Sequence, residues 1–463
     1  MNLFKQEDTI AALATGSAKS ALSVIRISGA SAKQIVSSVF FTKNNKKIEL
    51  LDRKVLHGYI CNGLKKIDEV ILYYMQAPHT YTGEDTVEIS CHGNPLIVEQ
   101  VTELLFSKGV RLAERGEFTY RAYMNNKLDL SEAEAVNDLI NSNSSKTAEL
   151  ALNSLQGSLS SQIKKIKQDL TELFAYLEAS LDYPEEDIDF LTRKEKKEKM
   201  QKIISQVENL VSSYSLTKLV ANGIKISIVG KPNAGKSSIL NTILGYQRAI
   251  VTDIAGTTTD TIEEQIEYKG ISFIISDTAG IRNHTNNTIE KIGQDRSRQS
   301  VNTADIILWV TDGSTLLDDN DKQIADLLKD KKDKTIVILN KSDLKQNLSV
   351  EELKNIFDFS SYINFSTINK TPVENILNKI YELLNLNNID QETTVLLNAR
   401  QYNLILNIKE NLLKVLSLID KGDSDEIVSF ETNNVLLLLN DVLGIDTKED
   451  ILHSIFSKFC VGK

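Results

Sequence analysis

The chain has 463 residues, a hydrophobic fraction of 41%, a charged fraction of 25% and a net charge of −10. This length allows about three domains with ample cores, and the composition is that of a folded globular protein. The negative charge disfavours nonspecific adhesion to nucleic acid or to an anionic membrane, so any contact with RNA requires a local basic patch or a basic partner.

The first residues and the cysteines indicate a reducing compartment. Glu7 and Asp8 stand where a signal peptide would be basic, and no apolar run approaches the ~18 residues of a membrane span. The cysteines Cys61, Cys91 and Cys460 are too widely spaced for a zinc knuckle or a disulfide framework. We therefore expect a cytoplasmic protein without a membrane span.

Residues 1–120 predict an N-terminal domain of mixed α/β or α+β type. Period-2 runs predict strands at 22–27, 54–60, 69–75 and 86–90, and a helical pattern follows at 95–108. Glu88 alternates with apolar neighbours in the last of these strands. It therefore either points into a cleft or lies on a solvated strand face.

Residues 121–220 and 386–463 predict a helical domain. Glycine is scarce in the first of these segments, and helical periodicity predicts helices at 128–140, 147–181, 194–214, 394–418, 426–443 and 448–459. Since both segments flank residues 221–385, we infer that a separate domain is inserted into one discontinuous helical domain. A basic run from Arg193 to Lys202 is interleaved with glutamates, so we interpret it as a solvated helix face rather than an RNA patch.

The inserted region begins with a phosphate-binding loop. A strand-like run at 224–229 leads into Gly230-Lys231-Pro232-Asn233-Ala234-Gly235-Lys236-Ser237-Ser238, and a helical run continues to 244. This segment fits G-x-x-x-x-G-K-[ST] at every fixed position and has the flanking strand and helix that the motif requires. The backbone N–H groups would cradle phosphates, Lys236 would reach the outer phosphates, and Ser237 would bind Mg²⁺.

Four further motifs identify the nucleotide as GTP. A switch candidate, Thr252-Asp253-Ile254-Ala255-Gly256-Thr257-Thr258, would complete the Mg²⁺ shell, and Asp277-Thr278-Ala279-Gly280 would reach Mg²⁺ through water and sense the γ-phosphate. In Asn340-Lys341-Ser342-Asp343, the last carboxylate would accept hydrogen bonds from the ring N–H and exocyclic amine of guanine, which adenine lacks. The residues Ser366-Thr367-Ile368 would close over the base. Together these motifs predict a GTPase domain with a mostly parallel sheet.

The residue after Gly280 is Ile281, where a water-positioning glutamine would be expected. Asn233 offers a substitute, because its amide oxygen could bind a monovalent cation beside the β- and γ-phosphates. It could equally cap a turn. The residues alone leave both interpretations open.

The whole chain resembles the MnmE (TrmE) family of tRNA modification GTPases. The resemblance rests on the GTPase motifs, on residues 24–29, 81–85, 116–119, 126–130 and 151–157, and on the terminal Phe456-Ser457-Lys458-Phe459-Cys460-Val461-Gly462-Lys463. A GTPase inserted into a helical domain, together with a C-terminal Cys-x-Gly-Lys, is specific to this family.

The resemblance implies an N-terminal domain that binds formyl-tetrahydrofolate, resembles half of a folate-dependent aminomethyltransferase and forms homodimers. Folate contacts carry over to Arg26, Glu88, Lys127 and Lys463. A carboxylate suits the amide donors of a pterin, and cations suit the carboxylates of the glutamate tail. If this is right, Lys463 must lie near Glu88 and Arg26 in the folded protein.

The resemblance also implies a reaction and a partner. With FAD-dependent MnmG, in a heterotetramer, the chain would install an aminomethyl-type (carboxymethylaminomethyl) group at C5 of the wobble uridine of certain tRNAs. A rival function is a GTP-dependent binding switch, such as a ribosome-assembly or membrane-associated factor. Such a switch would share the GTPase motifs but would have no need of a folate pocket.

For the GTPase, the resemblance implies K⁺ bound by Asn233, Thr252, Ile254 and Thr257, and Mg²⁺ bound by Ser237 and Thr258. GTP and K⁺ would draw the two GTPase domains of a dimer together, and Glu290 would orient the attacking water. Glu290 also suits a helix N-terminus, and Cys460 is either chemically involved or a buried structural thiol. The chain departs from the family pattern at Thr259, Asn94 and residues 17–21.

Overall fold

The computed structural model describes residues 8–44, 46–47, 49–182, 191–245, 263–276, 298–390, 395–445 and 447–463. They fold into two compact units. The first comprises Met1–Asp138, Asn153–Val207 and Asn403–Lys463, and the second comprises Leu139–Leu152 and Glu208–Tyr402. The mixture of a helical part with α/β parts confirms the coarse fold class. The predicted division into three domains stays a prediction, because the first unit contains both the N-terminal segment and most of the helices.

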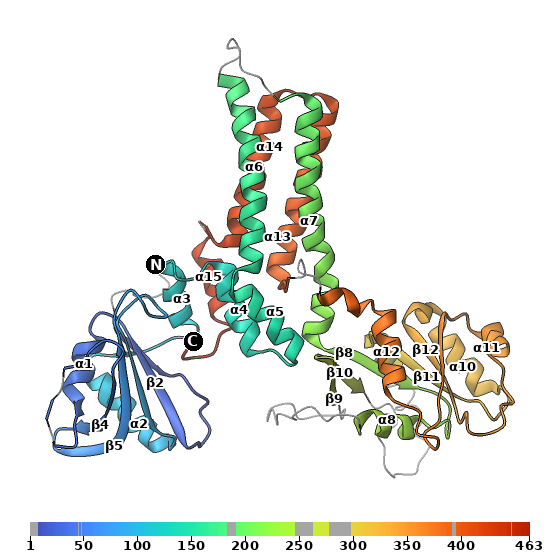
Figure 1. The fold of residues 1–463 in the computed structure, drawn as a ribbon, viewed down its shortest axis with the longest axis horizontal. Helices are drawn as coiled ribbons and strands as arrows, with labels where there is room; N and C mark the ends of the chain where they lie inside the picture. The colour runs from blue at the N-terminus through green and yellow to red at the C-terminus, as the bar shows by residue number, and fades with distance from the viewer. Residues whose placement is uncertain are drawn as a thin grey trace. The chain divides into compact units, whose positions relative to one another are not determined.

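A seven-stranded sheet forms the N-terminal part of the first unit, in the order β3-β4-β5-β6-β2-β1-β7 (Figure 1). The strands predicted in this region correspond to β2, β4, β5 and β6, whereas the short β1 was not predicted. Residues from alternate strand positions and from two helices form one apolar core, as is typical of a sheet with one covered face. The elements are β1 Ile10–Leu13, β2 Leu22–Ser28, α1 Ala32–Val39, β3 Phe40–Phe41, β4 Val55–Asn62, β5 Lys65–Met75, β6 Thr86–His92, α2 Pro95–Ser107 and β7 Arg111–Leu112.

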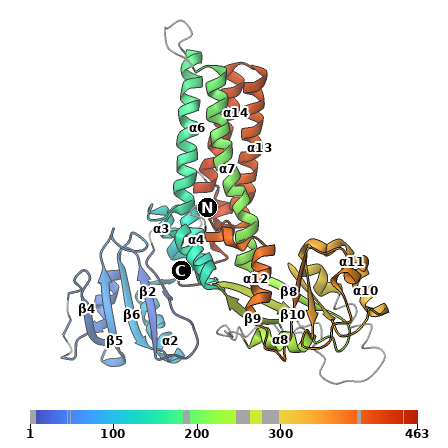
Figure 2. The ribbon, with the colours of Figure 1, turned by 45° about the vertical axis from the view of Figure 1, so that its right-hand side comes forward.

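Long helices form the rest of the first unit. Figures 1 and 2 show α6 running along α14, with the first part of α7 and the later part of α13 beside them. The buried face of α6 repeats every three or four residues, from Leu159 to Leu177, which is the spacing of an amphipathic helix. The elements are α3 Glu117–Met124, α4 Leu130–Ile140, α5 Ser145–Leu155, α6 Ser158–Asp182, α7 Arg193–Asn222, α13 Ala399–Lys421, α14 Asp425–Leu443 and α15 Glu449–Phe456.

The single helix predicted at 147–181 is wrong, because the structure has two helices there, α5 and α6. Gly157 lies between them with a left-handed φ of +88°. Its N–H donates to Ser154 O at 3.0 Å, and its own carbonyl accepts from Ser161 N at 2.8 Å. A left-handed glycine commonly ends a helix in this way, and the sequence pattern alone did not reveal the break.

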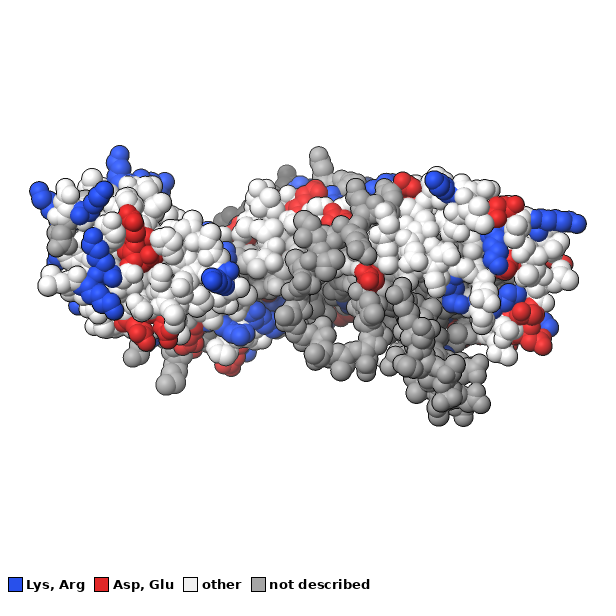
Figure 3. Space-filling model, turned by 90° about the horizontal axis from the view of Figure 1, so that it is seen from below, with Lys and Arg blue, Asp and Glu red and all other residues white. Residues whose placement is uncertain are grey.

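The basic run of α7 is paired with acidic residues of the same unit. Lys196 Nζ lies 2.6 Å from Asp425 Oδ2, and Lys197 Nζ lies 2.8 Å from Asp420 Oδ1. The Lys197 pair is exposed, as expected of a solvated helix face, whereas the Lys196 side chain is only 14% exposed. On a different face of the molecule, Figure 3 shows both acidic and basic side chains on the described residues. In the described part of the chain, no helix combines the length and apolar character needed to cross a bilayer.

The second unit is built on a six-stranded sheet in the order β13-β12-β11-β8-β10-β9. Only β9 is antiparallel to its neighbour, and apolar clusters cover both faces of the sheet. Because parallel strands end at one edge, the loops after β8 and β12 meet there. The elements are β8 Ile224–Val229, α8 Lys236–Leu244, β9 Glu263–Tyr268, β10 Ile271–Ser276, β11 Ile306–Asp312, α10 Asp319–Leu328, η1 Lys329–Lys334, β12 Thr335–Asn340, α11 Val350–Ile356, β13 Ser361–Asn364, α12 Glu374–Leu383 and η2 Leu386–Asp390.

Candidate functional site

The phosphate loop connects β8 to α8 as the sequence predicts. Gly235, at the N-terminal cap of α8, has a φ of +99°, and a Cβ there would lie 2.0 Å from Asn340 Nδ2. Gly230 is similarly confined, since a Cβ there would lie 2.3 Å from Val310 O. A side chain at either position would clash with the end of a neighbouring strand, so both positions require glycine. The loop leaves the N–H groups at the start of α8 at the sheet edge, where the helix dipole favours an anion.

Lys236 is held inside the loop in this structure. Its Nζ donates to Gly230 O at 2.8 Å and to Lys231 O at 2.9 Å. Asn233 and Ser237 are exposed, and Asn233 adopts a left-handed φ of +62°. The predicted metal ligands of this loop are thus accessible, while the ammonium is already oriented by the backbone that would surround the phosphates.

Asn340 joins the guanine motif to the phosphate loop. Its Nδ2 donates to Ala234 O at 2.8 Å, and its side chain is buried. Its Oδ1 is also buried and has no hydrogen-bond partner among the described residues. A buried acceptor without a partner is costly, so this atom suits a site that a ligand completes.

The guanine end of the site brings Asp343 together with Ser366. The Ser366 hydroxyl donates to Asp343 Oδ1 at 2.5 Å and accepts from Asn369 N at 3.1 Å. Ser366 is buried, whereas Ile368 is exposed at the same loop. The carboxylate expected to recognise guanine is therefore held by the loop expected to close over the base.

Lys341 is anchored to the end of β11. Its Nζ lies 2.5 Å from Asp312 Oδ2. Burial would raise the pKa of Asp312, but the ammonium of Lys341 and the hydroxyl and N–H of Ser314 outweigh it and hold that pKa below its ordinary value. The pair therefore stays charged at neutral pH and fixes the guanine loop to the neighbouring strand.

Several predicted residues lie outside the described part of the chain. They comprise the switch Thr252, Asp253, Ile254, Ala255, Gly256, Thr257 and Thr258, the motif Asp277, Thr278, Ala279 and Gly280, and Glu290. The K⁺ and Mg²⁺ contacts predicted on Thr252, Ile254, Thr257 and Thr258 therefore stay predictions.

A second cluster lies on the N-terminal sheet, where Arg26, Glu88 and Tyr73 meet across three strands. The register of β2, β6 and β5 places Arg26 and Tyr73 opposite Glu88. Arg26 Nε lies 2.8 Å from Glu88 Oε1, and the Tyr73 hydroxyl donates to Glu88 Oε2. The Glu88 side chain is 12% exposed, so it does not lie on a solvated strand face.

Aromatic rings surround this ion pair. The Arg26 guanidinium lies 5.5 Å from the ring centroid of Tyr81 and 5.7 Å from that of Phe118. Burial first, and then the hydrogen bond to Glu88, raise the pKa of Tyr73 to about 12, so its hydroxyl remains a donor. None of these three aromatic residues was predicted as a site residue, although Tyr81 and Phe118 lie in segments that carry the family resemblance. Period-2 alternation places Tyr73 on one face of β5, but only the register identifies Glu88 as its neighbour.

The C-terminal tail returns to this sheet. Gly116 N donates to Cys460 O at 3.4 Å, and Arg115 forms a bridge with Val461. Gly462 has a left-handed φ of +96°, and a Cβ there would lie 2.3 Å from Leu13 O. The tail therefore lies tightly against the edge of β1.

This docking places Lys463 within electrostatic range of Arg26 and Glu88. Burial and the nearby charge of Arg26 lower the pKa of the Lys463 ammonium, and the charge of Glu88 opposes this shift. Cys460 is exposed rather than a buried thiol. The structure thus brings together three of the predicted folate residues, from strands at one end of the chain and the tail at the other.

Lys127, the remaining predicted folate residue, lies between α3 and α4. Its Nζ donates to Pro78 O at 3.0 Å. It also lines a pocket of about 460 Å³ with Asp129, Glu132 and Lys164. Among these described residues, no recorded contact joins Lys127 to Arg26, Glu88 or Lys463.

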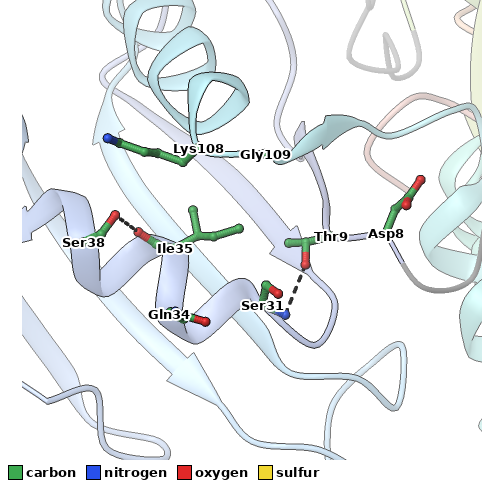
Figure 4. Close-up of a pocket in the computed structure, with 8 residues that line it drawn as sticks. All are labelled: Asp8, Thr9, Ser31, Gln34, Ile35, Ser38, Lys108 and Gly109. Atoms are coloured by element: carbon green, nitrogen blue, oxygen red, sulfur yellow. Dashed lines mark hydrogen bonds between the residues drawn. The ribbon is translucent and has the colours of Figure 1, made fainter.

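A separate polar pocket of about 480 Å³ opens beside β1 and α1 (Figure 4). Thr9 Oγ1 accepts from Ser31 N at 3.2 Å, and Ser38 Oγ donates to Ile35 O at 2.6 Å. Several of its polar groups are therefore satisfied within the chain. Its described lining residues include no residue predicted from the sequence: Asp8, Thr9, Ser31, Gln34, Ile35, Ser38, Lys108 and Gly109.

Comparison with known proteins covers both units. Residues 9–127 match the family described as "GTP-binding protein TrmE N-terminus", and residues 130–460 match "MnmE helical domain". The "tRNA modification GTPase MnmE" of Endomicrobium trichonymphae is 46% identical over 465 residues, covering 100% of each chain. The protein with the same name from Clostridioides difficile (strain 630) is 40% identical over 459 residues, covering 99% of each chain.

Proposed function

We propose that this chain, which belongs to the MnmE family of tRNA modification GTPases, uses its GTPase to drive a one-carbon-dependent modification of tRNA. As a member of this family it is a GTP hydrolase. The proposed reaction adds an aminomethyl-type (carboxymethylaminomethyl) group at C5 of the wobble uridine of certain tRNAs, with FAD-dependent MnmG as the partner. The observation that carries the proposal is that the C-terminal tail docks on the N-terminal sheet, through Val461 and Gly462, within electrostatic range of the Arg26–Glu88 pair.

The cluster on the N-terminal sheet suits formyl-tetrahydrofolate. Glu88 can accept hydrogen bonds from the amide donors of a pterin, while Arg26 and Lys463 can pair with carboxylates of the glutamate tail. Tyr73 and Arg26 hold the Glu88 carboxylate in place, so little ordering is needed on binding. Bound formyl-tetrahydrofolate would supply a one-carbon unit. Lys127 is also proposed as a folate contact. In this structure its ammonium donates a hydrogen bond to Pro78 O.

The GTPase site suits GTP with Mg²⁺ and K⁺. The loop N–H groups and Lys236 would bind the phosphates, Ser237 and Thr258 would hold Mg²⁺, and Asp343 would recognise guanine. Asn233, Thr252, Ile254 and Thr257 would hold K⁺ in place of an arginine finger. Glu290 would orient the attacking water.

The two sites would be coupled through assembly. We propose that the N-terminal sheets form a homodimer and that GTP and K⁺ draw the GTPase domains of that dimer together. This movement of the GTPase domains would take place within a heterotetramer of the chain with MnmG. Nucleotide state would thereby control the modification reaction rather than supply its atoms.

Isothermal calorimetry tests the proposal against a simple GTP-dependent switch. We expect 5-formyl-tetrahydrofolate to bind the purified chain, and Glu88→Gln to weaken binding at least about tenfold, because the variant loses a charged acceptor. Glu99→Gln, on the exposed face of α2, is the matched control and should bind normally. Absence of folate binding to the unmodified chain would favour the switch.

A further inference from the structure

Lys231 occupies a position of the phosphate loop that the G-x-x-x-x-G-K-[ST] motif leaves open. Its Nζ donates to Asp321 Oδ2 at 2.8 Å and to Asp318 Oδ2 at 3.2 Å. The Lys231 side chain is 11% exposed and that of Asp321 is 2% exposed. Solvent screens such a pair far less than a surface pair, and removing one partner leaves a buried charge.

The two carboxylates are themselves fixed at the start of α10 by a capping box. Asp318 Oδ1 accepts from the N–H groups of Asn320 and Asp321, at 2.9 Å and 3.1 Å, and Asp321 Oδ2 accepts from Asp318 N at 3.2 Å. Burial would lower the pKa of Lys231, but the two carboxylates outweigh it and raise that pKa. Lys231 is therefore charged and bound to a rigid acceptor.

The segment between β11 and α10 also anchors the guanine loop. Lys341 pairs with Asp312 where this segment begins, and Gly313 N donates to Asn340 O at 3.0 Å. Lys231 pairs with Asp318 and Asp321 where it ends. One connection thus contacts both nucleotide-binding loops and sets their separation.

The backbone of Lys231 bears directly on the motif lysine, because its carbonyl accepts a hydrogen bond from Lys236 Nζ at 2.9 Å. We propose that Lys231, clamped by Asp318 and Asp321, is a positioning residue that holds the phosphate loop in the shape that binds GTP. Loss of the clamp weakens GTP binding. It leaves the rate at which bound GTP is hydrolysed nearly unchanged. This inference rests on the GTPase activity of the chain and is independent of tRNA modification.

Steady-state GTP hydrolysis by the full chain tests the clamp. We expect Lys231→Met to raise KM for GTP about tenfold, which corresponds to the loss of one charge-assisted hydrogen bond. We expect kcat to change by less than about twofold, because the interaction contributes to GTP binding and not to the chemical step. Lys231→Arg should keep KM near the wild-type value, because it preserves the charge. Dissociation of a fluorescent GDP analogue should accelerate by a similar factor in Lys231→Met.

Two further variants separate positioning from general stability. Asp321→Asn should raise KM as Lys231→Met does, and the double variant should be no worse than either single one, because both remove the same interaction. Lys322→Met removes an exposed ion pair with Asp319 from the same helix and should leave KM unchanged. If Asp321→Asn unfolds the chain, Asp318→Asn tests the same clamp through its more exposed carboxylate, with a smaller rise in KM.

Wild-type KM and GDP release in folded Lys231→Met would overturn the inference, as would an equal effect of Lys322→Met. These outcomes leave GTP turnover by the unmodified chain intact. Failure of the proposed function would look different, since wobble-uridine modification would then be absent while the KM shift of Lys231→Met persisted.

Discussion

At the residue scale, Asp343 is the residue that we propose reads the guanine base, and the loop after β13 holds its carboxylate. The Ser366 hydroxyl occupies one of its carboxylate oxygens at 2.5 Å. Ser342 N donates to Phe365 O at 3.1 Å, which fixes the two loops to each other. A carboxylate held in this way accepts two N–H donors from guanine but finds a mismatch in xanthine, where one donor becomes an acceptor.

Asp343→Asn should therefore shift the preference from GTP toward xanthosine triphosphate. We expect the affinity for GTP to fall at least about 100-fold, because two buried hydrogen bonds to a charge are lost. Competition between the two nucleotides for a fluorescent GDP analogue measures the shift. The control is Asp358→Asn, at an exposed ion pair with Lys332. Unchanged GTP affinity in Asp343→Asn would mean that this residue does not read the base.

A second residue-scale prediction concerns Glu117, which pairs with Arg111 and Arg121 at 2.6 Å and 3.0 Å. Burial would raise the pKa of Glu117, but the two guanidinium groups and the N–H of Glu114 outweigh it and lower that pKa. Because the folded-state pKa lies below the ordinary value of 4.5, its stabilising contribution is present above pH 4.5 and is lost as pH falls through the folded-state pKa.

We expect Glu117→Gln to lower the free energy of unfolding by about 3 kcal/mol at pH 7, because it removes the buried carboxylate that Arg111 and Arg121 share and leaves them only Asp8 and Glu84 as acidic partners. Denaturant titrations at several pH values measure the difference between variant and wild type, with Glu99→Gln as the exposed control. The difference should shrink below about pH 4.5. A constant difference down to pH 3 would contradict the assignment of charge to Glu117.

Sequence pattern at this scale identifies candidate groups but not their partners. Alternation placed Glu88 on one face of its strand, and the family resemblance made it a ligand candidate. Tyr73, Tyr81 and Phe118 could not be found in this way, because each reaches the Arg26–Glu88 pair from a different element. Register and helix placement, rather than local pattern, decide such contacts.

At the element scale, the C-terminal tail is held in place by the aromatic residues that precede it. Phe456 and Phe459 are buried beside Tyr120, with ring centroids of Tyr120 and Phe456 5.3 Å apart. Those rings fix α15, and the left-handed Gly462 then turns the chain along β1. The position of Lys463 is thus set by apolar burial several residues earlier.

Gly462→Ala should displace the tail from β1. A Cβ would lie 2.3 Å from Leu13 O, and the left-handed φ adds strain of about 1 kcal/mol or more. We expect affinity for 5-formyl-tetrahydrofolate, measured by calorimetry, to fall about tenfold while GTP turnover stays unchanged.

The matched control is Gly63→Ala. Gly63 is also left-handed, with a φ of +60°, but a Cβ there meets no atom within 4 Å. This variant should show the backbone strain without the loss of folate affinity. Equal folate affinity in both variants would indicate that the tail does not contribute to the pocket.

Periodicity predicted several of the elements, but it missed helices such as α1 and α12 as well as elements that depend on single residues or on pairing. The strands β2, β4, β5 and β6 follow alternation, and α14 matches its predicted span closely. The break at Gly157 was missed because a single glycine within a helical pattern does not by itself signal an end. The strands β9 and β11 were not predicted, and the buried, unbroken apolar pattern of β11 carries no period to read.

At the scale of the whole molecule, the order of segments along the chain determines which parts fold together. The first unit contains segments from both sides of the GTPase region, and its N-terminal sheet and C-terminal tail share one cluster. The sequence indicated this order, because helical patterns flank the GTPase motifs. Only the family resemblance placed Lys463 near Glu88 and Arg26, since no local pattern records which strand the tail meets.

The proposed cation site gives a whole-protein prediction in solution. GTP turnover should be at least about tenfold faster in KCl than in NaCl at equal ionic strength, because K⁺ would stabilise transition-state charge between paired GTPase domains. Asn233→Gly should abolish the difference, since it removes the amide and still permits the left-handed φ of +62°. Equal rates of the unmodified chain in both salts would contradict the K⁺ assignment.

Mass spectrometry of wobble uridines tests most directly whether both sites serve one modification. Cells lacking this chain would be complemented with the wild type, with Lys236→Ala in the phosphate loop, with Glu88→Gln on the N-terminal sheet, or with Lys322→Met as a control. We expect the modified uridine to return with the wild type and the control, and to remain absent with either site variant. Full modification with Lys236→Ala or with Glu88→Gln would contradict the account.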